Sequence, residues 1–427
     1  MRYLALTKLE REQMIKDTGI SHVDELYAAA PKEFILTKKI DELPDHKGEI
    51  EVETHLRELS EKNKPASSMP FFLGAGCYYH HVPAAVDHLI QRSEFLTAYT
   101  PYQPEISQGT LKTIFQFQTI IARLTGMEVS NASLYDGATG LVEAVLMAVR
   151  IKKNKRKVAI LGDLNPDYLA VLKTYTDLAE IELISKNEID KNTAAVITAY
   201  PDFYGNTLNL EKVRVQADEV EALMIVVVTE ILSLGLMEAP KMADIVTGEA
   251  ASIGVGMNFG GPHLGFFACK KQYVRQIPGR ICGATVDEDN KESFVLTLNA
   301  REQHIRREKA TSNICSNQGL CAVAFTIHSF LLGEIGFKDL ALLNHQKACK
   351  LADILAKIRG VEVTNDSFFN EFTIKLSKDA KEVNQKLLER GVIGGLALDN
   401  NLMVIAVTEL TSEKDMEILA KHLKEIL

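Results

Sequence analysis

The sequence predicts an α/β protein, with a large domain on a mostly parallel sheet and a smaller α+β domain after it. Between about residues 70 and 330, short β-rich runs alternate with longer helical patterns, the order that a sheet with crossover helices requires. The clearest strands are continuous apolar runs, typical of strands buried on both faces. They lie at residues 158–161, 195–198 and 222–228. After Lys338, helices and short strands mix, which indicates the second domain.

The first 69 residues predict a helical arm. Thr7 with Glu10, and Ser21 with Asp24, have the spacing of a capping box, which satisfies the first backbone N–H groups of a helix. Another helix is predicted from about residue 50 to residue 62. These helices are too few to enclose a core, so we expect the arm to pack against the main body or a second chain. The predicted divisions are an arm at 1–69, a large α/β domain at 70–335 and a small domain at 336–427.

The other elements follow in chain order. In the large domain, helices are predicted to begin at Pro83, near Ser107, just after Gly140 and near Asp167, and a strand covers residues 264–269. The small domain is predicted to contain helices at 342–358 and 380–390 and strands at 360–363, 372–376 and 402–407. A last helix begins at Thr411–Ser412, with Asp415 as the partner of the cap.

Composition excludes several classes of protein. With 46% hydrophobic and 25% charged residues, the chain of 427 residues has the balance of a soluble globular enzyme. A net charge of −9 argues against a nucleic-acid partner, which requires a clustered positive field. The six cysteines form no CxxC pair, and no set of metal ligands is evident. The amino terminus lacks a secretory pattern, and the longest apolar run, 222–228, is too short to cross a bilayer, so we expect a cytoplasmic protein.

Residues 71–83, FFLGAGCYYHHVP, gather glycines, tyrosines and histidines. The glycines let the backbone turn tightly, and His80 and His81 could present acid–base groups to a cleft. The structural alternative is a packed loop leading into a helix that Pro83 begins. Because histidines are often only hydrogen-bonded, these residues alone favour the structural interpretation.

Residues 97–109, TAYTPYQPEISQG, form a stiff polar stretch. Its two prolines fix an extended path, so Tyr99 and Tyr102 are held with little entropy left to lose on binding. The alternative is a rigid connector whose Ser107 caps the next helix. Both interpretations stay open on these residues alone.

Residues 131–140, NASLYDGATG, precede an apolar helix, and free N–H groups at a helix start can hold a phosphate. The signal is weak. No P-loop lysine follows, and the carboxylate of Asp136 would repel an anion.

A basic stretch begins at Arg301 and reads REQHIRREKATSNIC. Its cations are followed by Thr311, Ser312 and Asn313 at a predicted helix start, which together indicate an anion site. A solvated basic loop is the alternative, because charge runs are usually that. The hydroxyls and amides directly after the cations favour anion binding.

Together these stretches resemble the P-protein of the glycine cleavage system, the pyridoxal-phosphate-dependent glycine dehydrogenase (decarboxylating). The resemblance extends through nearly the whole chain, and the blocks TAYTPYQPEISQG and REQHIRREKATSNIC are highly specific to that family. Some bacteria split this enzyme into two homologous subunits, and the chain resembles the amino-terminal one. The resemblance implies the fold type I architecture, a three-layer α/β/α large domain followed by a small α+β domain, which agrees with the pattern above.

Fold type I enzymes hold pyridoxal phosphate through a lysine Schiff base, and an acidic residue at the end of an earlier strand pairs with the pyridinium nitrogen. Matching by eye puts Glu230 at the acidic position and Ser252 at the lysine position. No lysine occurs between Lys241 and Lys270. A serine cannot form a Schiff base, so we expect the other subunit, subunit 2, to hold the cofactor covalently.

The resemblance also implies roles for particular residues. Thr311, Ser312 and Asn313 would reach, in trans, the phosphate of the cofactor held by subunit 2. Substrate-side candidates are Tyr99, Tyr102 and His81, which would border glycine and the channel to the lipoyl arm. In the two-plus-two heterotetramer that the family leads us to expect, glycine is decarboxylated and its aminomethyl group passes to the lipoyl arm of H-protein.

Two other functions remain to be weighed. The chain could be an independent fold type I enzyme, such as an aminotransferase, that uses Lys270 or Lys271. Those lysines follow the strand at 264–269 and therefore lie on the wrong side of the expected position. Alternatively, the chain could be a catalytically silent scaffold that only stabilises its partner.

Overall fold

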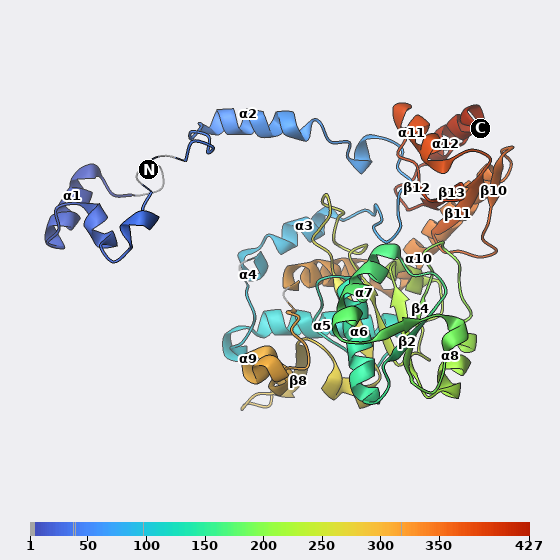
Figure 1. Cartoon of the computed structure of the whole chain (residues 1–427), viewed down its shortest axis with the longest axis horizontal. Coiled ribbons are helices and arrows are strands. Elements are labelled where there is room, and N and C mark those ends of the chain that lie inside the picture. The colour runs from blue at the N-terminus through green and yellow to red at the C-terminus, as the bar shows by residue number, and fades with distance from the viewer. Residues whose placement is uncertain (1–4, 37, 39, 97, 317) are drawn as a thin grey trace. The chain divides into compact units, whose positions relative to one another are not determined.

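A seven-stranded sheet organises the larger part of the chain (Figure 1). The computed structural model describes residues 5–36, 38, 40–96, 98–316 and 318–427. Neighbouring strands in this sheet are parallel except the two pairs that involve β7. In sheet order the strands are β1 Val129–Ser130, β7 Gly265–Cys269, β6 Ile245–Glu249, β5 Leu223–Val228, β4 Thr193–Ala199, β2 Lys157–Leu161 and β3 Glu182–Ile184.

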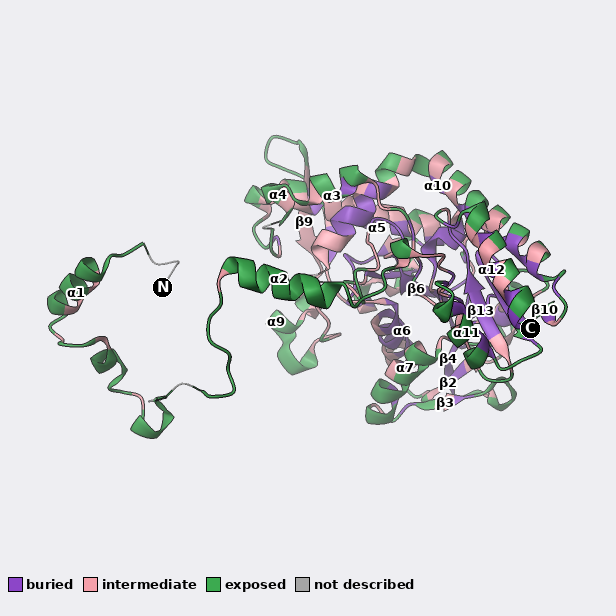
Figure 2. Ribbon diagram, turned by 90° about the horizontal axis from the view of Figure 1, so that it is seen from above, coloured by how far each residue is buried: buried purple, intermediate pink, exposed green. Residues whose placement is uncertain are grey.

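Helices cover both faces of this sheet. On β5 every residue is buried, and alternate residues face opposite cores: Met224 and Val226 belong to one hydrophobic cluster, Ile225 and Val227 to the other. This explains why the strand is a continuous apolar run. Helices α6 Gly137–Lys152 and α7 Pro166–Leu178 pack on one face, and α5 Gln108–Thr125 and α8 Leu210–Glu219 on the other. Figure 2 shows the buried strands between these layers. The predicted three-layer α/β/α domain is confirmed.

A second, four-stranded sheet forms the small domain, in the order β10-β11-β13-β12 and antiparallel throughout. Its core is packed by α11, by α12 and by the second half of a long helix, α10. The elements are α10 Gly319–Leu355, β10 Val361–Val363, β11 Glu371–Leu376, α11 Ala380–Glu389, β12 Leu396–Ala397, β13 Leu402–Ala406 and α12 Glu413–Ile426. Ser412 caps α12 in a box with Asp415, as predicted.

Helix α10 connects the two cores. Phe325 packs in the core on the face of the large sheet that α5 and α8 cover, whereas Leu351 and Leu355 pack in the small domain. The helix bends at Gly333, whose φ of 61° is strongly disfavoured for residues with a side chain. Among the described helices, α10 alone is long and apolar enough, by length and composition, to cross a membrane. Its buried contacts with both cores account for that composition equally well.

Shorter elements complete the larger unit. They are the helices α3 Ala84–Ile90, α4 Ser93–Leu96 and α9 Gln303–Arg306, the hairpin β8 Ile281–Val286 and β9 Glu292–Thr297, and the 3-10 helices η3 Ala66–Ser68, η4 Pro104–Ile106, η5 Lys186–Glu188, η6 Ile231–Gly235, η7 Lys271–Gln276, η8 Asn299–Arg301 and η9 Arg307–Lys309. The β8–β9 hairpin packs against α5 through Leu111 and Phe294.

The amino-terminal residues form a separate unit, Met1–Lys64, and the rest, Pro65–Leu427, forms the other. The first contains α1 Lys8–Asp17, η1 Val23–Tyr27, η2 Lys32–Phe34 and α2 Glu49–Ser60. None of these elements has a buried residue. Thr7 and Glu10 form the predicted capping box, but the second box is made by His22 and Glu25, not by Ser21 and Asp24. The domain limits at 69/70 and 335/336 stay predictions.

Two predicted helix starts in the larger unit are wrong, and the side-chain cap considered at Ser107 is absent although a helix does begin there. Helix α6 begins at Gly137, before Gly140, because the Asp136 side chain caps it by accepting from the Thr139 N–H at 2.7 Å. Ser107 precedes α5 but makes no side-chain capping bond. Residues 311–313 lie in a loop, since α10 begins only at Gly319.

Candidate functional site

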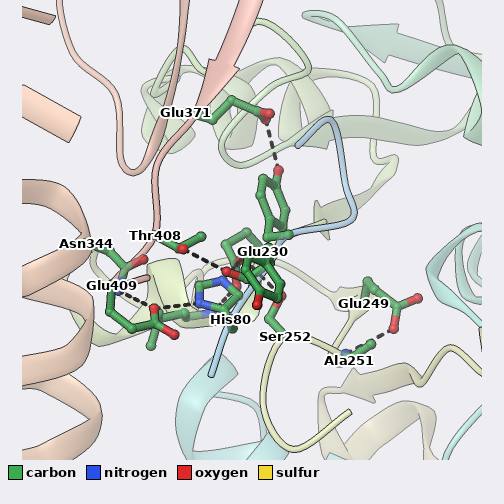
Figure 3. A network of polar contacts seen from close by, with 12 residues as sticks. His80, Glu230, Glu249, Ala251, Ser252, Asn344, Glu371, Thr408 and Glu409 are labelled. Atoms are coloured by element: carbon green, nitrogen blue, oxygen red, sulfur yellow. Dashed lines mark hydrogen bonds and ion pairs between the residues drawn. The ribbon is translucent and has the colours of Figure 1, made fainter. Parts of the chain in front are cut away.

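Glu230 and Ser252 lie against each other at the carboxyl edge of the large sheet. The Ser252 hydroxyl donates to Glu230 Oε2 at 3.0 Å. His80, from the loop before α3, places Nε2 3.0 Å from the same oxygen. Its Nδ1 lies 2.8 Å from Oε2 of Glu409, in the segment after β13. Figure 3 shows the His80 ring between Glu230 and Glu409, so one imidazole ties the large domain to the small one.

His80 is the cation of this buried group. Burial alone would lower the pKa of His80, but Glu230 and Glu409 outweigh it and raise that pKa to about 10. Burial likewise opposes ionisation of Glu409, yet the bonds that it accepts lower the pKa of Glu409 to about 2. The donors are His80, the His81 N–H at 2.6 Å and the Asn344 amide at 3.1 Å. At neutral pH the imidazolium therefore neutralises part of a carboxylate-rich pocket.

Glu371 on β11 makes a second buried joint with the same loop. It accepts from the Ala75 N–H at 2.6 Å and from the Tyr78 hydroxyl at 2.9 Å. Burial raises the pKa of Glu371 to about 7, against the bonds from Ala75 and Tyr78. Gly74 makes this approach possible, because a Cβ there would lie 2.4 Å from Glu371 Oε1. The loop at 71–83 is therefore packed between the domains.

The start of helix α6 is occupied by carboxylates of the chain itself. Asp136 accepts from Thr139, and Glu249 Oε2 accepts from the Gly137 N–H at 3.2 Å. The cavity beside Ser252 has a volume of only about 10 Å³. That volume is close to what a single water requires. Two N–H groups at the helix start are therefore already bonded to carboxylates of the chain, and the cavity has no room for a phosphate.

A larger cavity, of about 340 Å³, lies where the two family-specific blocks meet. Tyr99 and Tyr102 of the first block and Thr311 and Ser312 of the second line it. Tyr99 and Tyr102 are 82% and 53% exposed. Ligand pockets typically have volumes of about 300–1,000 Å³. We call this cavity the two-block pocket, and it unites four of the six site residues predicted from the sequence.

The remaining predicted site residues lie apart from the lining of the two-block pocket. Asn313 is exposed, and its carbonyl accepts from the Gln303 amide at 3.3 Å. His81 is exposed too, next to the buried group, where its backbone N–H bonds Glu409. Neither Asn313 nor His81 is among the described residues that line the pocket.

The basic stretch does not present all its cations to the two-block pocket. Arg301 donates to the carbonyls of Leu298 at 3.1 Å, Gly279 at 2.9 Å and Ile277, so its guanidinium holds the backbone. The cation with contacts on both walls is Arg280, which precedes β8. Its terminal nitrogen donates to the Tyr102 hydroxyl at 3.1 Å.

Sequence reasoning misses His80, Glu409, Glu371 and Arg280 as residues of the site. His80 stands inside a stretch that the sequence singles out, but the predicted site residue there is its neighbour His81. Glu409 lies 329 residues from His80, and no local pattern marks such a pair. Arg280 stands in an ordinary turn, after Pro278 and Gly279. Among the described residues, no cluster of His, Cys, Asp and Glu has the geometry of a metal site.

The sheet order, the single reversed strand β7 and the small carboxyl-terminal domain place the chain in the fold type I class of pyridoxal-phosphate-dependent enzymes. The fold is shared with a glutamate decarboxylase from Lactobacillus brevis at 12% identity, a TM-score of 0.66 and coverage of 94% of this chain and 96% of the other. The family model of the glycine cleavage system P-protein matches residues 1–423. The chain belongs to that family.

Two further comparisons agree. A relative from Parvibaculum lavamentivorans, described as a probable glycine dehydrogenase (decarboxylating) subunit 1, is 51% identical over 450 aligned residues and covers 100% of both chains. The crystal structure of a glycine decarboxylase (P-protein) of the glycine cleavage system, in inhibitor-bound form, is 41% identical, with a TM-score of 0.93 and coverage of 100% of both chains.

Proposed function

We propose that the chain is the subunit of a two-subunit glycine dehydrogenase (decarboxylating) that completes the active site without holding pyridoxal phosphate covalently. The relatives named subunit 1 support the existence of a partner, subunit 2, and on this proposal that partner supplies the lysine. Bound pyridoxal phosphate would supply the sink for the electrons of the C–C bond that breaks in glycine.

The contacts around Ser252 carry this proposal. Ser252, which we match to the lysine position of the family, carries a hydroxyl that already donates to Glu230 at 3.0 Å. His80 contacts the same oxygen of Glu230, and the adjoining cavity measures about 10 Å³. The residues here do not fit the cofactor, so we derive no chemical step at this pocket.

An independent enzyme that uses Lys270 is not favoured. Lys270 follows β7, which runs antiparallel to β6, and Cys269 pairs with Ile245 at the start of β6. Lys270 is therefore at the sheet edge opposite to Glu230. Its ammonium is held by Asp244 at 2.8 Å. Lys271, the next residue, begins η7 at that same edge.

The two-block pocket is the proposed contribution to the shared active site. Thr311 and Ser312 would face the phosphate of the cofactor held by subunit 2, with Asn313 beside them, and Tyr99, Tyr102 and His81 would border glycine and the entry of the lipoyl arm. The exposed aromatic rings support an interface, because Tyr is enriched where proteins meet. The Ser312 hydroxyl also accepts from the Ile314 N–H at 3.1 Å, which orients it.

The proposed overall reaction balances in atoms and electrons. Glycine loses CO2, and the electron pair of the broken C–C bond forms a C–S bond between its methylene carbon and one sulfur of the lipoyl disulfide on H-protein. The S–S bond breaks, and the second sulfur takes a proton and leaves as a thiol. The disulfide is thereby reduced, and glycine is oxidised.

Borohydride reduction tests which chain holds the cofactor. The complex of this chain with subunit 2 and pyridoxal phosphate is reduced and digested, and its peptides are mapped by mass spectrometry. We expect the pyridoxyl group on a lysine of subunit 2 and none on this chain, because Ser252 offers no amine. The chain treated alone is the control. A pyridoxyl group on Lys270, Lys271 or any other lysine of the isolated chain would overturn the proposal.

Substitutions in the two-block pocket and at Asn313 beside it distinguish a site-forming subunit from a silent scaffold. We expect Tyr99→Ala and Asn313→Ala to lower kcat/KM for glycine by about tenfold or more, since each removes a contact worth roughly 1.4 kcal/mol or more. Complex formation, followed by sedimentation, serves as the control. Full turnover by both variants in an intact complex would favour the scaffold.

A further inference from the structure

One guanidinium joins the walls of the two-block pocket. The Arg280 guanidinium donates to the Tyr102 hydroxyl at 3.1 Å and lies 5.6 Å from the centre of the Tyr102 ring. On the other wall it donates to Ser316 Oγ at 3.5 Å and contacts Cys315 Sγ at 3.7 Å. The loop that contains Tyr102 and the loop that contains Ser312 are therefore held by the same side chain.

Arg280 is a largely buried cation beside a carboxylate. Its side chain is 11% exposed, and its Nε lies 3.5 Å from Glu302 Oε2. That buried Nε and Glu302 Oε1 have no hydrogen-bond partner among the described residues. Buried polar groups are usually paired, but Arg280 Nε is a donor that the described residues leave without a hydrogen bond, although Glu302 offsets part of its charge. Arg301, the other arginine in the described lining, is fully engaged with backbone carbonyls.

We propose that Arg280 is a positioning residue of the assembled active site, which holds the Tyr102 hydroxyl and the 311–316 loop in one arrangement around an oxyanion brought by subunit 2 or by substrate. The inference rests on the proposed function. A planar guanidinium suits this role because it donates in several fixed directions at once, whereas an ammonium cannot. The oxyanion is a phosphate ester or a carboxylate, two groups with the same hydrogen-bonding chemistry.

The test is a double-mutant cycle in the complex with subunit 2. Arg280→Lys keeps the charge and removes the planar guanidinium with its several donors. Tyr102→Phe keeps the ring and removes the hydroxyl. We expect each variant to raise by about tenfold either the dissociation constant of pyridoxal phosphate or the KM for glycine, with kcat changed less than about twofold. A rise in the first constant identifies a phosphate, and a rise in the second identifies a carboxylate.

The coupling between the two substitutions in this cycle distinguishes a positioning role of Arg280 from a purely structural role. If Arg280 acts through Tyr102, the affected constant should rise no further in the double variant than in either single variant. Arg275→Lys, at an exposed arginine on the same segment, is the matched control and should change neither constant. A purely structural role would lower kcat through lost active enzyme while leaving both constants unchanged. That result, or additive effects in the cycle, would overturn the inference.

The outcome also stays separate from that of the proposed function. Without release of CO2 from glycine by the wild-type complex, the proposed function fails. If the wild type is active and both variants bind cofactor and glycine normally, only the role of Arg280 fails. Should Arg280→Lys not fold, Tyr102→Phe still decides, because the exposed hydroxyl can be removed without opening the core.

Discussion

At the scale of single residues, His80 balances carboxylates that come from separate domains. Its side chain is 3% exposed, as expected for a group inside a core. A buried ion pair adds little net stability, but removing one partner strands the others in a medium of low dielectric constant. Loss of the imidazolium should therefore destabilise the contact between the two domains by more than the small net stability that the intact ion pairs add.

We expect His80→Gln to lower the free energy of unfolding of the purified chain by about 3–5 kcal/mol, because Glu230 and Glu409 lose their shared cation. Unfolding in urea, followed by circular dichroism because the chain has no tryptophan, measures this loss. His88→Gln, at an exposed histidine on α3, is the control.

The loss should depend on pH. The pKa of His80 is raised, so its stabilisation is complete below the ordinary histidine pKa of 6.5 and falls as the pH rises toward about 10. The pKa of Glu409 is lowered, so its part is complete above the ordinary glutamate pKa of 4.5 and is lost as the pH falls toward about 2. The difference between wild type and His80→Gln is therefore widest between these two ordinary values. A difference that does not vary with pH would show that His80 is not charged.

Some site residues were predictable one at a time, and others were not. Glu230 follows a clear strand, Ser252 was matched to the family by eye, and the structure brings these two residues together. Arg280 and Glu409 matter only through partners far along the chain. Their contacts arise from the tertiary fold, which a local pattern does not encode.

At the scale of elements, local chemistry correctly predicted the buried strands and the capping boxes at Thr7 and Ser412, whereas the caps considered at Ser21 and Ser107 are absent. Strands buried on both faces are continuous apolar runs, and capping boxes depend on residues three positions apart. The start of α6 was predicted too late, after Gly140, because the cap formed by Asp136 was not recognised. The start of α10 was predicted too early, at residues 311–313, and its continuity through the bend at Gly333 into the predicted helix at 342–358 was not predicted.

The arm unit yields a prediction at this scale. Its described elements have no buried residue, and the apolar side chains of Leu9, Phe34 and Leu36 are 76%, 79% and 73% exposed. Segments without a core open easily and are cut first by proteases. We expect trypsin to cleave the isolated chain first within residues 5–64, and subunit 2 to slow that cleavage by about tenfold or more.

Mass spectrometry of the early fragments identifies the cut sites. An equal concentration of serum albumin, added in place of subunit 2, is the control for competition. If the arm is cut equally fast in the complex, its apolar side chains are not covered by subunit 2.

At the scale of the whole molecule, the fold class was predictable because alternation of strand and helix patterns leaves few architectures. The α/β domain, the α+β domain and the family all follow from patterns spread over the chain. The reversed direction of β7 and the pairing of β1 with β7 were not predictable, since a short apolar run does not specify its neighbour or direction.

The small cavity beside Ser252, next to the contacts of Ser252 and His80 with Glu230, has a consequence for the cell. A ligand stabilises only the folded state that binds it, so an enzyme that holds its vitamin-derived cofactor becomes less stable when that cofactor is scarce. Here the buried imidazole of His80, which is part of the polypeptide, contacts Glu230. If subunit 2 holds the cofactor, as proposed, we expect the stability of this subunit alone not to depend on vitamin B6 supply, so that a pool of it could persist until loaded partners become available.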